Sequence, residues 1–203
     1  MTRMMLLLLA HAVALFSVAS GSQEEYVNAG ILPYSTASGQ VTVLLGFDAG
    51  EGHWSDFVGV CTPGETPSQT ASRQFAEETR GAYALADISR RLQGAAPVQV
   101  GNTRIFLLEV PEVSPRQLER LSKDRGFEKT NYCWVPLLDM LASIDDRGPN
   151  RAQVPASCIA DSQDLYDLVG QNLQQGHEMR QRLLSPDQGA SVTNLGVSPR
   201  CGR

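Results

Sequence analysis

The sequence is poor in the residues and motifs that mark several specialised classes of protein. It has four cysteines and three histidines in 203 residues, the histidines lie far apart, and C-x-x-C does not occur. A disulfide scaffold needs more cysteines than this, and a zinc site needs ligands at closer spacing. Gly and Pro, at 18 and 11 residues, are near average, which excludes collagen-like and strongly disordered chains.

Basic clusters are missing as well. The net charge is −5 and the longest run of Lys or Arg is the pair Arg90-Arg91, so we expect no nucleic-acid partner. The chain has neither a Gly-x-Ser-x-Gly nucleophile motif nor an internal repeat. Its length fits one domain of ordinary size with a single core.

Residues 1–20 have the three parts of a secretory signal peptide. Arg3 is followed by an apolar run from Met4 to Val18, and the small residues around Ser20 resemble a cleavage site. The run is shorter than the ~20 apolar residues that span a bilayer. We therefore expect cleavage and export to the periplasm or the medium, with attachment to a membrane only if the signal is retained.

Export has a consequence for the cysteines, which are Cys61, Cys133, Cys158 and Cys201. An oxidising compartment allows them to form disulfides, and four cysteines allow three full pairings. One disulfide, two disulfides and buried thiols all remain open from the sequence.

Apolar and β-branched runs predict a sheet, and two capping patterns predict helices. Thr66-Pro67 followed by Gln69 is typical of a helix start, Gly81 is typical of a helix stop, and Ser114-Pro115 repeats the start pattern. We expect a hairpin over 28–34 and 41–47, extended segments over 54–60, 104–110 and 132–135, and helices over 66–80, 114–125, 137–143 and 161–184, the last interrupted at Gly170 and Gly176.

These elements predict an α/β (α+β) fold with a mixed sheet. We expect a single domain over residues 21–184, with a helical extension from about residue 161, and a flexible tail over 185–203.

The helix after Thr66 carries the residues that suggest chemistry. Gln74, Glu77 and Glu78 share one face at i, i+3 and i+4, and Glu65 lies in the turn just before the cap. Clustered carboxylates repel one another unless a cation compensates them, and Mg²⁺ or Mn²⁺ prefers carboxylate oxygens. The alternative is a solvated helix face on which Arg73 pairs with Glu77.

The segment from Gly59 to Gly81 resembles the signature of the Nudix hydrolases. Gly59 and Glu65 have the required spacing, and Arg73, Phe75 and the pair Glu77-Glu78 follow in the required order. Ala29 to Tyr34, Trp54 to Phe57 and Trp134 to Leu137 also resemble members of that family, so the resemblance covers residues 26–143.

The resemblance implies a Nudix-type mixed β-sheet sandwiched between helices. It also implies hydrolysis of a phosphoanhydride bond in a nucleoside diphosphate linked to another moiety, with Mg²⁺ (or Mn²⁺) as cofactor. In this family pattern Glu65, Glu77 and Glu78 would hold the metal and Arg73 would position the glutamate pair. Apart from the family pattern, Trp54 is a candidate for stacking on the nucleotide-like substrate, with core packing as the alternative, and Gly59 is a second candidate for substrate contact.

Two positions depart from the family pattern. Gln74 stands where the family has Glu, and it cannot accept a proton near neutral pH. Arg80 stands where the family has Gly, and we expect the helix to continue by one residue and stop at Gly81.

The resemblance then leaves open which residue is the general base that activates water, since some family members use a glutamate later in the chain. Glu128 is the candidate, with an ordinary loop carboxylate as the alternative, and Glu109 and Glu112 are weaker candidates. Lys129 and Arg104 are weaker candidates for phosphate contacts. The sequence thus leaves two main functions, a metal-dependent hydrolase or a catalytically impaired ligand-binding or scaffold module. A structural protein with a fortuitous motif is the third.

Overall fold

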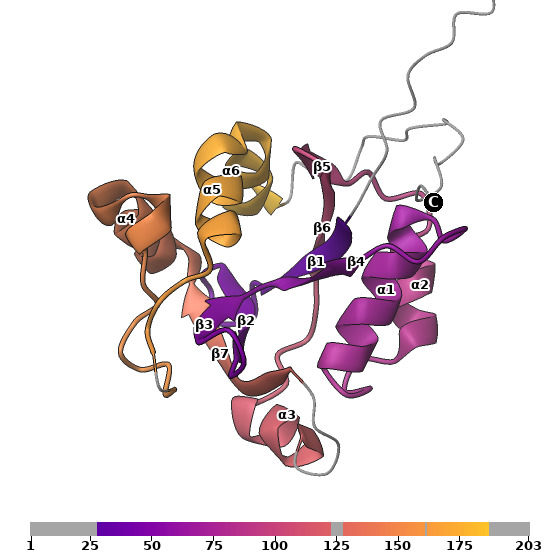
Figure 1. Cartoon of the computed structure of the whole chain (residues 1–203), viewed down its shortest axis with the longest axis horizontal. Helices are drawn as coiled ribbons and strands as arrows, with labels where there is room; N and C mark the ends of the chain where they lie inside the picture. The colour runs from indigo at the N-terminus through magenta and orange to yellow at the C-terminus, as the bar shows by residue number, and fades with distance from the viewer. Residues whose placement is uncertain (1–27, 123–127, 161, 187–203) are drawn as a thin grey trace, which may run out of the picture.

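A mixed sheet with helices on both faces forms the framework of the chain (Figure 1). The computed structural model describes residues 28–122, 128–160 and 162–186. Within them the sheet has seven strands: β1 (Asn28–Ser35), β2 (Thr42–Asp48), β3 (His53–Ser55), β4 (Phe57–Val60), β5 (Val98–Val100), β6 (Thr103–Glu109) and β7 (Lys129–Pro136).

Strand β1 is the centre of the sheet. It pairs in parallel with β6 and antiparallel with β4 and β2, while β7 and β3 flank β2, and β5 flanks β6. The predicted β1–β2 hairpin exists, but its pairing is limited to Tyr34 with Val43 and Ser35 with Thr42. Along most of its length β1 pairs with β4 and β6 instead. These neighbours place β1 inside the sheet, and its residues are buried on both faces.

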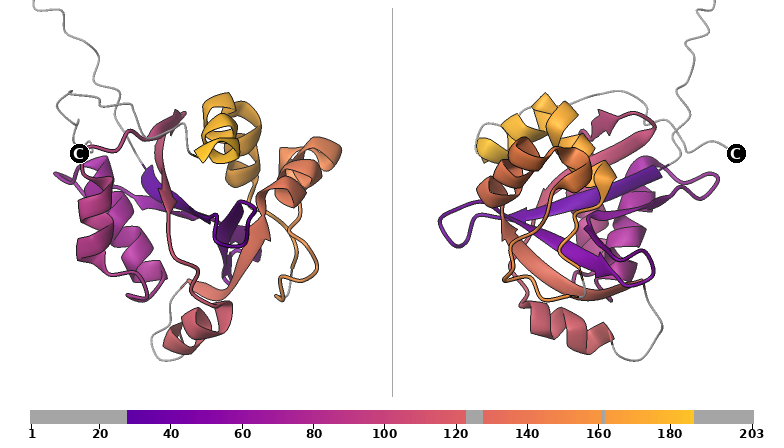
Figure 2. Two further views of the ribbon diagram at one scale, coloured as in Figure 1. Left: turned by 180° about the vertical axis from the view of Figure 1, so that it is seen from behind. Right: turned by 60° about the vertical axis from the view of Figure 1, so that its left-hand side comes forward.

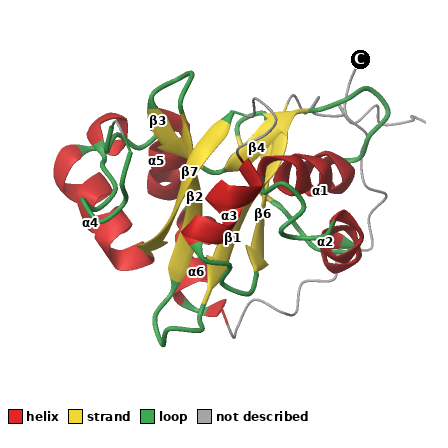
Figure 3. Ribbon diagram, turned by 90° about the horizontal axis from the view of Figure 1, so that it is seen from below, coloured by secondary structure: helices red, strands yellow, loops and turns green. Residues whose placement is uncertain are grey.

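The helices divide between the two faces. They are α1 (Pro67–Glu78), α2 (Leu85–Leu92), α3 (Pro115–Ser122), α4 (Leu137–Arg147), α5 (Asp167–Gln175) and α6 (His177–Leu184), with a 3-10 turn at Pro149–Arg151. One buried cluster joins the sheet to α1, α2 and α3, and a second joins it to α4, α5 and α6. Figure 3 shows the strands between these two groups, so the mixed sheet between helices is as predicted.

The capping patterns give the predicted starts of α1 and α3. In α1 the Thr66 hydroxyl accepts from the Gln69 backbone N–H at 3.3 Å, and the Gln69 side chain accepts from the Thr66 N–H at 2.8 Å. Helix α2 and strand β5 were not predicted. The N-cap residue of α2, Ala84, makes no side-chain cap hydrogen bond, so the sequence carries no local start signal for this helix. The predicted end of α3 near residue 125 and the signal peptide 1–20 lie outside the described residues.

The predicted helix over 161–184 is wrong at its start and in one of its breaks. Helix α5 begins only at Asp167 and runs through Gly170, where a Cβ would lie 2.4 Å from the Pro149 carbonyl oxygen. Gly170 is therefore a point of close helix packing, and only Gly176 separates α5 from α6. Figure 2 shows these two helices beside α4.

The segment before α5 is fastened to the sheet through Trp54 and a disulfide. The Trp54 backbone bonds Asp164 and Tyr166 at 2.8 and 2.7 Å, and the Trp54 indole donates to the Ser162 carbonyl at 2.9 Å. Cys158 forms a disulfide with Cys133 of β7, and Cys61 is also disulfide-bonded, while Cys201 lies outside the described residues. Among the described helices, none has the length and hydropathy required to cross a bilayer.

Candidate active site

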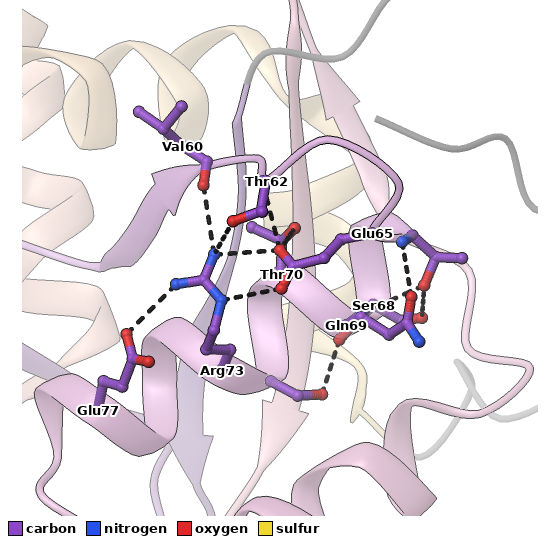
Figure 4. Close-up of polar contacts among 10 residues, drawn as sticks. Val60, Thr62, Glu65, Ser68, Gln69, Thr70, Arg73 and Glu77 are labelled. Atoms are coloured by element: carbon purple, nitrogen blue, oxygen red, sulfur yellow. Dashed lines mark hydrogen bonds and ion pairs between the residues drawn. The ribbon is translucent and has the colours of Figure 1, made fainter. Parts of the chain in front are cut away.

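The loop before α1 is fastened by a two-point ion pair between Glu65 and Arg73 (Figure 4). Arg73 Nε and Nη2 donate to the two oxygens of Glu65 at 3.0 and 3.1 Å, and the Thr70 hydroxyl and the Thr62 N–H add bonds at 2.7 and 3.3 Å. The hydrogen bond from Arg73 is the main cause that lowers the pKa of Glu65 to about 2. The Glu65 carboxylate therefore anchors the loop in its ionised form.

Arg73 also contacts Glu77, but more weakly. Its Nη1 lies 3.3 Å from Glu77 Oε2, and the Glu77 side chain is 54% exposed. Arg73 further donates to the Val60 carbonyl and the Thr62 hydroxyl at 3.5 and 3.2 Å. The guanidinium thus ties β4, the loop and α1 together, and the predicted Arg73–Glu77 pair exists as a peripheral part of this network.

Glu78, the next residue, lies in a different environment. It is buried, and its Oε2 atom has no hydrogen-bond partner. Burial is the main cause that raises its pKa to about 8; Lys129 acts in the opposite direction, and Glu128, Asp56 and Asp48 raise the pKa further. Glu77 and Glu78 therefore do not form one carboxylate face, because one points to solvent and the other into the protein.

Gln74 packs directly on the backbone of β4. A Cβ placed on Gly59 would lie 1.9 Å from Gln74 Nε2 and 2.2 Å from Gln74 Cδ. Gly59 is required at this point because only a residue without a side chain leaves room for the amide. The signature glycine and the departure at position 74 are thus in direct contact. Behind them, Ala71, Phe75 and Thr79, spaced at i, i+4 and i+8 along α1, are fully buried.

The end of α1 differs from the prediction. The helix stops at Glu78, and Arg80 takes a left-handed conformation with φ 57°. Its N–H bonds the Glu77 carbonyl at 3.0 Å, and the Gly81 N–H bonds the Ala76 carbonyl at 2.8 Å, which is a Schellman motif. Arg80 thus adopts the left-handed conformation that glycine usually takes after a helix. Its guanidinium donates hydrogen bonds to the Tyr132 hydroxyl and the Lys129 carbonyl, which stabilise it there.

Sequence reasoning did not identify two buried residues, Asp56 and Lys129, whose charges act on the pKa of Glu78. Asp56 is 7% exposed and Lys129 is 5% exposed. Burial raises the pKa of Asp56 to about 6, and Lys129 again opposes the shift. A signal was available in Gly46, since an isolated glycine in an apolar strand indicates a close approach, and here the Lys129 stem passes over it.

The remaining predicted residues have separate positions. Glu128 is exposed, and its charge contributes to the raised pKa of Glu78, while its role as the base stays a prediction. Trp54 is fully buried and packs against Phe47, so its predicted contact with substrate is wrong and its role is in the core. The substrate contact of Gly59 stays a prediction.

The carboxylates do not fit a divalent ion in this arrangement. Mg²⁺ or Mn²⁺ requires several converging oxygen ligands. Glu65 and Glu77 are both engaged by Arg73, and burial raises the pKa of Glu78 and so disfavours its charged form. Across residues 28–122, 128–160 and 162–186, no group of three or more Asp, Glu, His or Cys side chains is placed to hold a metal ion.

The chain has detectable similarity to known proteins in its structure and not in its sequence. No protein-family profile matches the chain, and no curated protein sequence matches it. The chain is similar to solved structures of Nudix proteins.

One is an Ap4A hydrolase of C. elegans in a binary complex, at 17% identity and a TM-score of 0.42, covering 76% of this chain and 98% of that one. Another is the Nudix hydrolase RenU of M. smegmatis, at 16% identity and a TM-score of 0.45. The match covers 84% of this chain and 90% of RenU. A third is the Nudix domain of NrtR from Shewanella oneidensis in complex with ADP ribose, at 12% identity and a TM-score of 0.36. The match covers 77% of this chain and 88% of that one. At identities below 20%, these similarities do not indicate which substrate this chain binds.

Proposed function

We propose that this chain is a Nudix-fold protein that binds a nucleoside diphosphate linked to another group and whose hydrolytic chemistry is impaired. The observation that carries the proposal is the contact between Gln74 and Gly59. An amide occupies the place where the family signature has a carboxylate, and an amide cannot take a proton from water near neutral pH. The loss of a general base costs about 10²–10⁴-fold in rate.

The start of the signature segment is held as a rigid scaffold. The two-point pair of Glu65 and Arg73 and the capping box at Thr66 hold the loop and α1 in one arrangement. Such a preformed loop supports ligand binding whether or not the chemistry is retained. This is the reason to propose a binding module in place of an unrelated structural protein.

The proposed location is outside the cytoplasm, after removal of residues 1–20. The Cys133–Cys158 disulfide supports this proposal, because structural disulfides persist in oxidising compartments. The ligand would then be an extracellular compound or an intermediate of the cell envelope, taken as a nucleotide-like small molecule.

A functional hydrolase is the second candidate, and one observation favours it. The buried carboxylate of Glu78 has an unpartnered oxygen, and the charge of the exposed Glu128 contributes to its raised pKa. In this alternative Glu128 would be the base. A divalent metal would be held only after Glu65 or Glu77 left Arg73, so Mg²⁺ or Mn²⁺ dependence is a separate matter for experiment.

The deciding experiment compares binding and turnover. Nucleotide-sugars, dinucleoside polyphosphates and ADP-ribose are tested with Mg²⁺, with Mn²⁺ and with EDTA, using calorimetry for binding and product analysis for hydrolysis. We expect binding without turnover in the natural chain, and a gain of at least tenfold over background in Gln74→Glu. Gln69→Glu is the matched control, because it makes the same change on the same helix and keeps the capping box.

The opposite pattern would replace the proposal. Turnover in the natural chain that Gln74→Glu leaves unchanged, and that Glu128→Gln removes, would establish the hydrolase with Glu128 as its base. A chain that binds none of the three classes would contradict both candidates.

A further inference from the structure

Cys61 is engaged in a disulfide, and the other cysteines of the sequence narrow the choice of its partner. Cys133 and Cys158 are bonded to each other, and Cys61 is disulfide-bonded as well. The sequence contains four cysteines, so the cysteine that remains for Cys61 is Cys201. Such a bond connects the start of the signature segment with the segment 187–203, which lies outside the described residues.

Cys61 lies between two residues that are fastened to the start of α1. The Val60 carbonyl and the Thr62 hydroxyl accept from the Arg73 guanidinium at 3.5 and 3.2 Å (Figure 4). The Thr62 N–H donates to Glu65 at 3.3 Å. Because both neighbours of Cys61 are held in this way, a residue bonded to Cys61 is held at one place on the surface.

A groove of about 460 Å³ opens beside this place, between the loop, α1 and α2. It is lined by Pro63, Gly64, Glu65, Arg73, Leu85 and Ser89. Leu85, at the start of α2, gives the groove an apolar wall that is 49% exposed. The lining begins two residues after Cys61, so a segment bonded to Cys61 lies next to the groove.

The segment 187–203 begins near the opposite end of α2. The described chain stops at Pro186, just after α6, and Arg182 in the last turn of α6 donates to the Ala96 carbonyl at 2.9 Å. Ala96 follows shortly after the end of α2, whereas Leu85 at its start lines the groove. A path along α2 therefore leads from the beginning of the segment to the groove.

The segment is long enough for this path. Fifteen peptide bonds separate Pro186 from Cys201, and an extended chain of that length reaches about 50 Å. This exceeds the diameter of a compact domain of ~150 residues, which is about 40 Å. A disulfide holds its two Cα atoms about 4–7 Å apart, so the residues just before Cys201 come within reach of the groove.

The sequence before Cys201 suits an apolar groove. Leu195 and Val197 alternate with smaller residues, so their side chains share one face when the chain is extended. Pro199 restricts Ser198 to extended conformations, which favours that arrangement.

We propose that Cys201 is bonded to Cys61 and that residues 195–200 lie in the groove beside Arg73 as its internal occupant. The inference concerns a docking surface within one chain and does not depend on the proposed function. While the disulfide is intact, the occupant closes the groove next to the Glu65–Arg73 pair to other ligands.

Peptide mapping of the natural chain without reduction tests the pairing. We expect one linked pair of peptides containing Cys61 and Cys201 from a monomeric chain, and dithiothreitol should separate them. A link from Cys61 to Cys133 or Cys158 would overturn the inference. A Cys61–Cys201 link found only in a covalent dimer would also overturn it, because a second copy would then be the occupant.

Hydrogen–deuterium exchange of the complete chain tests the docking. The double variant Leu195→Ser/Val197→Ser keeps both cysteines and removes the apolar contact. We expect the amides of residues 64–69 and 85–89 to exchange at least tenfold faster in this variant than in the natural chain. Val192→Ser is the matched control, because it makes the same kind of change in the same segment outside the occupant, and it should leave these rates unchanged.

Unchanged exchange around the groove in the double variant would overturn the docking. Equal acceleration in α4, which packs on the other face of the sheet, would also overturn it, because the effect would then be a general loss of stability. Neither measurement uses a nucleotide, so their failure is distinct from failure of the proposed function, which is measured by ligand binding and turnover.

Discussion

The side-chain amide of Gln74 lies on the backbone of Gly59 so closely that even a methyl group there would meet it at 1.9 Å. The two residues belong to different elements, α1 and β4, which approach each other closely at this contact. A substitution at either position is therefore felt at the other, and the coupling between them can be measured.

We expect Gly59→Ala to lower the free energy of unfolding by about 1–3 kcal/mol, because the new methyl group forces the Gln74 side chain to move. Gln74→Ala in the same chain should recover more than half of that loss. Urea unfolding of both single variants and the double variant gives the coupling. Gly50→Ala is the control, since its nearest neighbour is a flexible carboxylate at 3.3 Å, and it should change stability by less than about 0.5 kcal/mol. Strict additivity would contradict the contact.

The Glu65–Arg73 pair should contribute more than the Arg73–Glu77 pair. Both members of the first pair are less than one-third exposed and they bond at two points, whereas Glu77 is 54% exposed. We expect Glu65→Gln to cost about 1–2 kcal/mol and Glu77→Gln less than about 0.5 kcal/mol in urea unfolding.

Arg73→Lys provides a further comparison for this pair. A lysine cannot make the two-point contact, so the variant should be about as unstable as Glu65→Gln. Equal costs for Glu65→Gln and Glu77→Gln would show that the loop is held in another way.

Stability should fall as the pH rises from about 5 to 8. Burial raises the pKa of Glu78 from 4.5 to about 8 and that of Asp56 from 3.8 to about 6, so the folded chain binds protons that the unfolded chain has released. Glu65 acts in the opposite sense, since its pKa of about 2 favours the folded state above pH 4.5 and that gain is lost as the pH falls further.

The pH effect can be assigned to one residue. We expect Tm, followed by circular dichroism, to decline between pH 6 and pH 9 in the natural chain and to be flatter in Glu78→Gln, which carries no charge at any pH in this range. The exposed Glu77→Gln should reproduce the natural profile. A natural profile that is level from pH 5 to 9 would be incompatible with a buried, electrostatically strained Glu78.

Arg80 combines a strained backbone with two favourable contacts, and a pair of variants separates them. Arg80→Ala and Arg80→Gly both lose the guanidinium bonds to Tyr132 and to the Lys129 carbonyl, but only glycine relieves the left-handed conformation. We expect Arg80→Gly to be more stable than Arg80→Ala by about 1 kcal/mol. Equal stabilities would mean that the backbone at this position carries no strain.

Local patterns in the sequence were sufficient for the elements whose signals are local. The capping box at Thr66 places the start of α1, and the spacing of Ala71, Phe75 and Thr79 gives its buried face. Helix α2 has no side-chain cap, and α5 contains a glycine, so both depend on packing against other elements and their bounds were not predictable. The pairing of β1 with β6 in place of a long hairpin is likewise a long-range choice.

By itself, the sequence determined the identity and spacing of the signature residues, including the amide at position 74. The tertiary structure alone decided the environment of each of those residues. Three glutamates that are equivalent by type differ in environment: Glu65 is paired with Arg73, Glu77 is exposed, and Glu78 is buried near a lysine fifty-one positions later in the chain. The charge and proton affinity of a carboxylate depend on its solvation and its neighbours, and these are set by strands that the chain brings together only on folding.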